Sequence, residues 1–234
     1  MSVHFFHGDK GGVGKSFIAA SFVDWLITRR GLTPLVVDSD MRNPDLTRMF
    51  ENATTTHNVD LRQHEGWLEL LSLLDESEHH EVVVSLPAGI GAEVNEELPA
   101  FFDGTRELRR ETTLLWALSR TPDSINLLRP AMAAFQDHAR AMVVLKNLFF
   151  GDPERFGRWN ESKTRTAFED AHGAVVDFPD LLDRLVDQTA MANPPVAFSS
   201  KLEGLRFGDR SELSRWLGKI DALWSGLAER LGIR

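Results

Sequence analysis

Short runs of apolar residues alternate along this chain with longer stretches in which apolar residues recur at every third or fourth position. The continuous runs are typical of strands buried in a parallel sheet, and the spaced pattern is typical of helices that cover such a sheet. We predict strands at 3–7, 34–37, 82–84, 112–118, 141–145 and 174–179, and an edge strand at 57–61. We predict helices at 16–30, 67–74, within 92–110, from 122 through 135, and at 164–170, 180–190 and 209–231, with a loop at 148–160. The alternation predicts an α/β fold, a doubly wound and mostly parallel sheet flanked by helices, as a single domain over residues 1–234.

The composition narrows the class of protein. With 42% hydrophobic and 26% charged residues, the chain has the usual make-up of a soluble globular protein. Its net charge of −9 gives no bulk attraction to nucleic acid, so nonspecific DNA binding would need a local basic patch formed in a dimer. The absence of cysteine excludes disulfides and cysteine-bound zinc or iron–sulfur clusters. There is no basic leader and no apolar run of about 18 residues, so we expect a cytoplasmic protein that does not span a membrane.

A glycine-rich stretch, Gly-Asp-Lys-Gly-Gly-Val-Gly-Lys-Ser at residues 8–16, joins the first predicted strand to the first predicted helix. Glycines let backbone N–H groups approach phosphate oxygens, and the helix N-terminus adds partial positive charge. Lys15 supplies a full charge for the β- and γ-phosphates, and Ser16 supplies a hydroxyl for Mg²⁺. The alternative is a glycine-rich turn with two solvated lysines. The residues that we predict to contact the nucleotide are Gly11, Gly12, Val13, Gly14, Lys15, Ser16 and Phe17.

The loop departs from the strict pattern Gly-x-x-x-x-Gly-Lys-Ser/Thr. Asp9 stands where that pattern has glycine, and a second lysine, Lys10, follows it. This form resembles the deviant Walker A loop of the ParA/MinD family of ATPases, which are P-loop NTPases of SIMIBI type. The resemblance implies ATP and Mg²⁺ as cofactors and an ATP-dependent homodimer. In that dimer Lys10 would reach the nucleotide of the partner subunit and take part in catalysis.

Two acids, Asp38 and Asp40, follow the second predicted strand at its carboxyl end. A doubly wound sheet places that end beside a bound nucleotide. The run Asp-Ser-Asp with the polar turn that follows resembles the second signature of the same family. The resemblance implies that Asp38 lies near Mg²⁺, together with Ser16, and that Asp40 orients the attacking water. The alternative interpretation of Asp38 and Asp40 is a pair of acids that cap a turn. The glycine-rich loop upstream argues against it.

The segment after the strand at 82–84 resembles the switch segment of the family, Asp-x-Pro-Ala/Pro-Gly, with one difference. Here Ser85 stands where the family has an aspartate that accepts a hydrogen bond from Mg²⁺-bound water. Gly89 is still able to turn an N–H group towards a γ-phosphate. We therefore expect that nucleotide binding is kept and that hydrolysis is slow.

Two further positions are assigned to the base by resemblance. Asn147 follows the strand predicted at 141–145, where many relatives have an asparagine that reads the adenine edge; a turn residue at a strand end is the alternative. Pro194 lies in a run, Asn-Pro-Pro-Val, that resembles the second base-contacting loop of the family.

The last predicted helix, at 209–231, is amphipathic, and proteins that resemble MinD end in a membrane-binding helix. Here the basic side chains of the helix are nearly matched by acidic ones, which makes it a poor ligand for anionic lipid. We therefore expect this helix to pack on the domain, with a membrane partner disfavoured.

Together the motifs imply an ATP-binding, slowly hydrolysing ParA-like ATPase that acts as a nucleotide-controlled dimer switch. The runs at 118–124 and 143–151 resemble the ParA-like ATPases encoded with plasmid conjugation and mobilisation genes, with partition as the neighbouring role. Its partner would be a DNA-bound adaptor or a relaxase. Two alternatives stay open. One is a non-hydrolysing nucleotide-dependent scaffold, which Ser85 supports; the other is a ligase of the dethiobiotin synthetase type, against which Lys10 argues.

Overall fold

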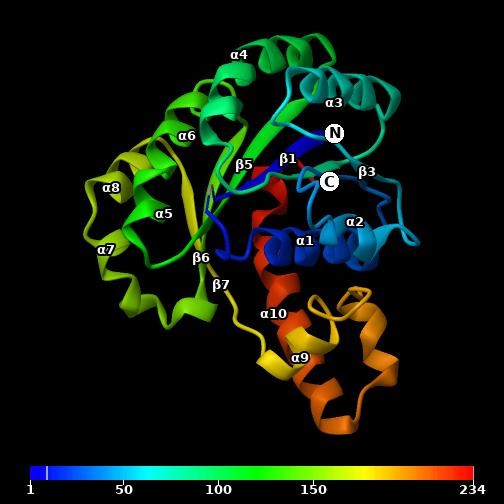
Figure 1. The fold of residues 1–234 in the computed structure, drawn as a ribbon. Helices are drawn as coiled ribbons and strands as arrows, with labels where there is room; N and C mark the ends of the chain where they lie inside the picture. The colour runs from blue at the N-terminus through cyan, green and yellow to red at the C-terminus, as the bar shows by residue number, and fades with distance from the viewer. Residues whose placement is uncertain (9, 234) are drawn as a thin grey trace.

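Seven strands form one sheet in the computed structural model, which describes residues 1–8 and 10–233 (Figure 1). The strand order is β3-β2-β4-β1-β5-β6-β7, and every neighbouring pair is parallel. The strands are β1 (Ser2–His7), β2 (Leu35–Asp38), β3 (Thr56–Asn58), β4 (Val82–Ser85), β5 (Glu111–Leu118), β6 (Ala141–Asn147) and β7 (Ala174–Phe178). The predicted fold class is confirmed, with β3 at one edge. Asp9, at which the loop departs from the strict pattern, lies outside the described residues.

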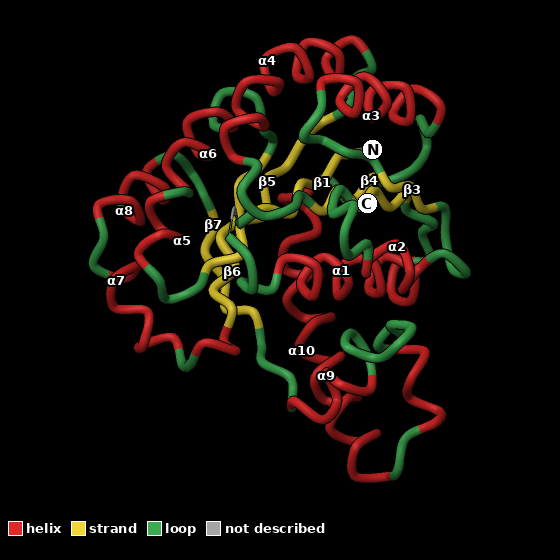
Figure 2. Tube along the Cα trace, viewed as in Figure 1, coloured by secondary structure: helices red, strands yellow, loops and turns green. Residues whose placement is uncertain are grey.

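Helices cover both faces of the sheet (Figures 1 and 2). One face carries α1 (Lys15–Arg30), α2 (Asp45–Phe50), α9 (Asp183–Gln188), the 3-10 helix η3 (Ser199–Gly204) and α10 (Phe207–Leu231). The other face carries α3 (His64–Glu76), α4 (Gly91–Glu107), α5 (Pro122–Asn126), α6 (Leu128–Phe135), η1 (Leu148–Phe150), η2 (Pro153–Phe156), α7 (Gly157–Asn160) and α8 (Lys163–Asp170). Among the described residues, no helix is long and apolar enough to cross a membrane.

Several segments differ from the sequence prediction. The helix predicted at 180–190 is the shorter α9, and η3 is not predicted. The helix predicted from residue 122 through 135 is two helices, α5 and α6, because Pro130 has no N–H for the carbonyl of Asn126 and fits only in the first turn of a new helix. The loop predicted at 148–160 contains η1, η2 and α7, and it buries Phe156 and Trp159. Helix α2 is not predicted, because six residues are too few to show a helical period.

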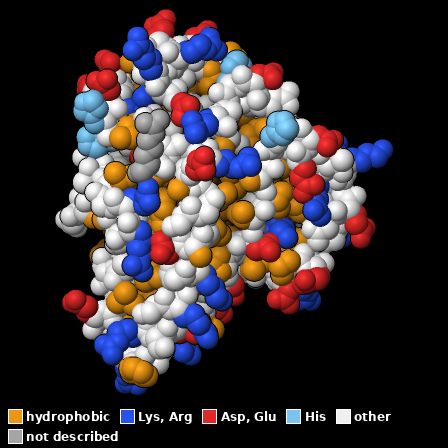
Figure 3. Space-filling model, turned by 180° about the vertical axis from the view of Figure 1, so that it is seen from behind, with side chains coloured by type: hydrophobic (Ala, Val, Ile, Leu, Met, Phe, Trp, Pro, Cys, Tyr) orange, Lys and Arg blue, Asp and Glu red, His pale blue; other side chains and the backbone are white. Residues whose placement is uncertain are grey.

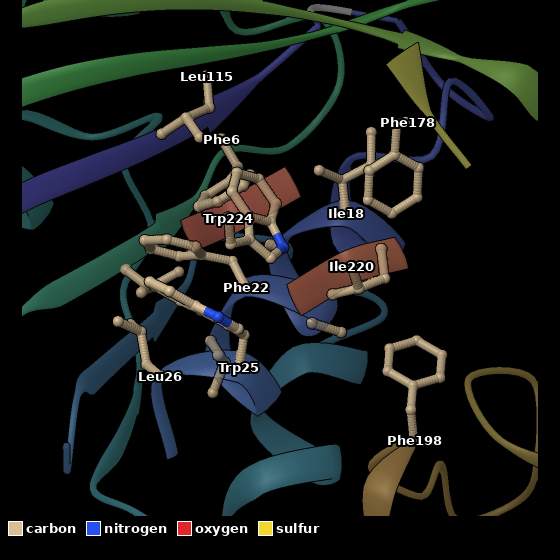
Figure 4. Close-up of a cluster of buried hydrophobic side chains, with 14 of the residues drawn as sticks. Phe6, Ile18, Phe22, Trp25, Leu26, Leu115, Phe178, Phe198, Ile220 and Trp224 are labelled. Carbon is tan, nitrogen blue, oxygen red and sulfur yellow. The ribbon is translucent and has the colours of Figure 1, made fainter. Parts of the chain in front are cut away.

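The two apolar cores follow from the alternation of side chains along the strands. In β1, Phe6 faces α1 and α10, whereas Phe5 faces the helices of the opposite layer. Helix α10 turns its apolar stripe to α1, where Trp224 packs edge-on against Phe22 with 4.8 Å between ring centroids (Figure 4). The stripe is therefore core, in agreement with the packed helix expected from the sequence.

Replacing Trp224 with alanine is expected to lower the free energy of unfolding by about 3–5 kcal/mol. The indole ring is fully buried, and its Nε1 donates a hydrogen bond of 3.2 Å to Ser21 Oγ, so the substitution opens a cavity and removes this bond. The measurement is chemical denaturation followed by circular dichroism. Phe207→Ala is the matched control, because Phe207 is 78% exposed on the same helix and its loss should change stability by less than about 0.5 kcal/mol. Equal unfolding midpoints for the two variants would show that α10 is not part of the core.

The carboxyl ends of the parallel strands all lie along the same side of the sheet, at the ends of the strands. Strand β1 runs there into the glycine-rich loop, and β2 and β4 end at Asp38 and Ser85. These two residues are register partners, and Ser85 is also the partner of Phe6 in β1. Strand β6 delivers Asn147 to the same edge. Four segments that are far apart in sequence therefore meet where a ligand of this kind of sheet binds.

Candidate nucleotide-binding site

The glycine-rich loop has the backbone that its glycines predict. Gly12 and Gly14 have φ values of 74° and 92°, in the left-handed region, and α1 begins directly after Gly14. A Cβ atom added at Gly14 would lie 2.4 Å from Asn147 Nδ2. Glycine is therefore required there for its conformation and for the close approach of β6.

Two cavities lie on either side of the loop and share the edge formed by Gly12, Gly14, Phe17 and Met191. We call the first, of about 270 Å³, the phosphate cavity; it is lined by Gly11, Gly12, Gly14, Lys15, Ser16, Phe17, Ala20, Asp40, Asp45, Leu46, Met49, Ala88, Ala190 and Met191. We call the second, of about 500 Å³, the base cavity; it is lined by Gly12, Gly14, Phe17, Asn147, Phe149, Pro179, Asp180, Leu181, Asp183, Val186, Asp187 and Met191. The phosphate cavity is lined by loop glycines and the first residues of α1, which suits the phosphates of a nucleotide. The base cavity is lined in part by aromatic side chains, which suits the base.

The two lysines of the loop have different surroundings. Lys15 is buried, and its Nζ donates a hydrogen bond of 2.8 Å to the carbonyl oxygen of Lys10. The Lys10 side chain is 37% exposed, and its Nζ lies 2.7 Å from Asp123 Oδ2 at the start of α5. Lys15 is thus directed along its own loop and lines the phosphate cavity, whereas Lys10 is held at the surface of the domain.

The two predicted acids also differ. Asp40 lines the phosphate cavity, and its Oδ1 accepts hydrogen bonds of 3.1 Å from the backbone N–H groups of Arg42 and Asn43. Asp38 is buried behind it, and its two carboxyl oxygens accept hydrogen bonds from the N–H groups of Asp40 and Leu46. Burial raises the pKa of the Asp38 carboxyl to about 6, although these backbone N–H groups act to lower it. Both acids therefore cap a turn, and Asp40 also faces the cavity.

The donors at the phosphate cavity fit Mg²⁺. The Ser16 hydroxyl is a hard oxygen ligand on this cavity, and the Asp40 carboxylate on the same cavity is an acceptor for bound water; Mg²⁺ bound with a nucleotide commonly uses one or two protein oxygens together with phosphate oxygens and water. The described residues contain no group of three or more His, Cys, Asp and Glu side chains that would form an all-protein metal site. Asp38 does not line the cavity, so its metal role stays a prediction.

The switch segment, residues 85–91, borders the phosphate cavity through Ala88. Its first residue, Ser85, is buried, and its carbonyl oxygen accepts a hydrogen bond of 3.0 Å from Ser39 N. Gly89 has a φ of 67°, a conformation that favours glycine. Ser85 therefore lies beside Asp38 at the strand ends, where the resemblance places the missing carboxylate.

The base cavity contains one of the two predicted base-contacting residues. Asn147 Nδ2 donates a hydrogen bond of 3.0 Å to the carbonyl of Val13, and its Oδ1 accepts one of 3.1 Å from Phe149 N. Asn147 is thus both a turn residue and a bridge from β6 to the loop. Pro194 is exposed and is not among the residues that line the cavity.

The base cavity is also lined by three acids that were not predicted from the sequence: Asp180, Asp183 and Asp187. Burial raises the pKa of Asp180, and the negative charge of Asp183 raises it further. The sequence held a signal for this, because Asp180 comes just after the carboxyl end of strand β7, and Asp38 lies at the carboxyl end of β2. Carboxylates here offer acceptors for the N–H groups of a base.

The sheet, the deviant Walker A loop and the paired cavities define a P-loop nucleotide-binding fold of the ParA/MinD type. The fold is similar to that of MinD in the MinC:MinD cell division protein complex of Aquifex aeolicus, with a TM-score of 0.50 and 12% identity over 95% of this chain and 96% of that chain. It is also similar to a Cyanothece McdA variant in complex with ATP, with a TM-score of 0.50 and 14% identity over 100% of this chain and 97% of that chain. No family model matches the sequence.

The sequence itself is similar to that of the protein MobD of Acidithiobacillus ferrooxidans. The two are 33% identical over 226 residues, which cover 97% of this chain and 97% of the relative. The chain belongs to the MobD family.

Proposed function

We propose that this protein is a slowly hydrolysing ATPase that ATP converts from a monomer to a homodimer, and that it serves plasmid transfer or mobilisation in the cytoplasm. The observation that carries the proposal is the pair of lysines. Lys15 already lines the phosphate cavity, whereas Lys10 lies at the surface in an ion pair with the exposed Asp123, from which it would be released to cross a subunit interface. Phosphate release by the purified protein, with and without DNA, tests the activity.

Each residue of the site has a proposed role that follows from its position. Lys15 and the loop N–H groups would hold the phosphates, and Asn147 would hold the base edge. Ser16 would bind Mg²⁺, with Asp38 behind it, and the ion would neutralise charge on the phosphate oxygens. Asp40 would orient the attacking water from its place in the phosphate cavity, and Lys10 would stabilise transition-state charge.

The partner that we propose is a DNA-bound adaptor or a relaxase. The support is the resemblance of the runs at 118–124 and 143–151 to ParA-like ATPases encoded with plasmid conjugation and mobilisation genes, together with the similarity to MobD. Direct nonspecific DNA binding is the weaker proposal. Basic and acidic side chains are interspersed over the face drawn in Figure 3, so this face has no basic patch of its own, and the proposal invokes a patch that forms when subunits pair. Partition of a plasmid or chromosome is the neighbouring role.

A second candidate function is a non-hydrolysing nucleotide-dependent scaffold. The observation that favours the scaffold is Ser85. Its hydroxyl lacks the negative charge of the aspartate that the switch segment of the ParA/MinD family has at this position. Absence of phosphate release together with retained ATP-dependent dimers would select the scaffold. A ligase of the dethiobiotin synthetase type is disfavoured by Lys10, which such enzymes lack.

Replacing Ser85 with aspartate is expected to lower the Mg²⁺ concentration needed for half-maximal ATPase activity, by about 10- to 100-fold, and to speed turnover. Charge-assisted hydrogen bonds to Mg²⁺-bound water are roughly twice as strong as neutral ones. The measurement is a Mg²⁺ titration of the ATPase rate. Ser85→Ala is the matched control, and it should need more Mg²⁺ than the parent protein. If the aspartate variant needs as much Mg²⁺ as the parent, residue 85 does not act on the metal.

A further inference from the structure

A positively charged side chain reaches the tip of the switch segment from outside it. Arg62 lies in the loop between β3 and α3, and its guanidinium donates a hydrogen bond of 2.8 Å to the carbonyl oxygen of Ala88. Ala88 lines the phosphate cavity, whereas Arg62 lines neither cavity. The base of the segment is held differently, by a backbone hydrogen bond from Leu86 N to Phe6 O.

The loop that carries Arg62 is rigidly built. Leu61 is fully buried, and its carbonyl accepts a hydrogen bond of 2.9 Å from the indole of Trp67. Asp60 Oδ1 accepts one of 3.1 Å from the backbone N–H of Arg62 itself. Gly66 packs so closely on this loop that an added Cβ would lie 2.2 Å from Asp60 O. Arg62 therefore projects from a fixed platform, which suits a residue that positions another segment.

The carbonyl that Arg62 contacts belongs to the same peptide unit as the N–H of Gly89. In a planar trans peptide these two groups point in opposite directions, so holding the carbonyl fixes the direction of the N–H. Gly89 has no Cβ and a positive φ, so without such a contact this peptide unit can rotate at little steric cost.

We propose that Arg62 is a positioning residue that sets the orientation of the Ala88–Gly89 peptide, and that discrimination between nucleoside triphosphate and diphosphate depends on it. The second half rests on the proposed function, since it assigns the Gly89 N–H to the γ-phosphate. An arginine suits this role because its guanidinium is always charged and its donors are planar and fixed.

The first test needs no nucleotide. Hydrogen exchange of the peptide covering residues 86–91 is expected to be about fivefold faster in Arg62→Ala than in the parent protein, because one hydrogen bond that holds the segment is lost. Arg106→Ala is the matched control, since Arg106 is exposed on α4 and its ion pair is with Asp103 on the same helix. Equal exchange in the two variants would overturn the positioning role.

The second test measures affinity for Mg²⁺-ATP and for ADP by calorimetry. Arg62→Ala is expected to weaken ATP binding about fivefold and to leave ADP binding unchanged, and Arg62→Lys, which keeps a charged donor, should recover part of the loss. Equal weakening for both nucleotides, or none for either, would overturn the discrimination role. If the parent protein binds neither nucleotide, the proposed function fails, while the exchange experiment still decides whether Arg62 orders the switch segment.

Discussion

Alanine in place of Lys15 is expected to weaken the binding of Mg²⁺-ATP by about 100-fold, because a hydrogen-bonded charge facing a phosphate contributes about 1.5–3 kcal/mol. The second lysine of the loop, Lys10, does not line the phosphate cavity and is paired with Asp123, so it does not replace this charge within one subunit. Lys15 lines the phosphate cavity at the first residue of α1, so its loss removes the charge where the phosphates would lie. Isothermal titration calorimetry measures the change directly.

Lys219→Ala is the matched control for this variant, since Lys219 is exposed on α10. Its affinity for ATP should equal that of the parent protein. Circular dichroism of Lys15→Ala shows whether the domain stays folded, because the replaced side chain is buried. A folded Lys15→Ala protein with the affinity of the parent would mean that the glycine-rich loop does not hold the phosphates.

Alanine in place of Lys10 is expected to give a different result: ATP still binds, the ATP-dependent dimer is lost, and hydrolysis falls about 1,000-fold. A cation that crosses an interface into a site shielded from water stabilises the transition state without being needed for binding within one subunit. Light scattering with ATP and a phosphate-release assay measure the two losses.

Asp123→Asn separates this interpretation from a purely structural one. It removes the carboxylate that lies 2.7 Å from Lys10 Nζ but leaves the lysine in place. Exposed ion pairs of this kind contribute about 0–1 kcal/mol, so the dimer should persist and can strengthen by up to about fivefold. A normal dimer from Lys10→Ala, or its loss in Asp123→Asn, would refute the cross-interface role.

The fold could be predicted where the sequence pattern is local and repeated. The run of valines at 82–84 specifies a buried strand, and Gly31 marks the end of α1, where it has a φ of 64°. Short elements such as α2 and the break before α6 could not be predicted as securely, because packing and one proline decide them over a few residues.

The phosphate cavity of the candidate site could be predicted, because one contiguous loop, residues 8–16, contains the glycines, the lysine and the serine that suit phosphates and Mg²⁺. Asp40 and Asn147 also reach the cavities, since strand ends in a parallel sheet converge. The contacts of Arg62 with Ala88 and of Lys10 with Asp123 join residues that are 26 and 113 positions apart, and only tertiary packing brings them together. The cavity contacts of Asp180 likewise depend on where the chain runs after β7.

ATP is proposed to convert this protein, through Lys10, from a monomer into a homodimer. Sedimentation velocity of the parent protein with Mg²⁺-ATP, Mg²⁺-ADP and no nucleotide tests this conversion, and a non-hydrolysable ATP analogue holds the ATP-bound state. We expect the monomer mass with ADP or without nucleotide, twice that mass with ATP or the analogue, and the monomer mass for Lys10→Ala under every condition. The same mass for the parent protein under all conditions, while calorimetry shows that ATP is bound, would refute the ATP-driven dimer.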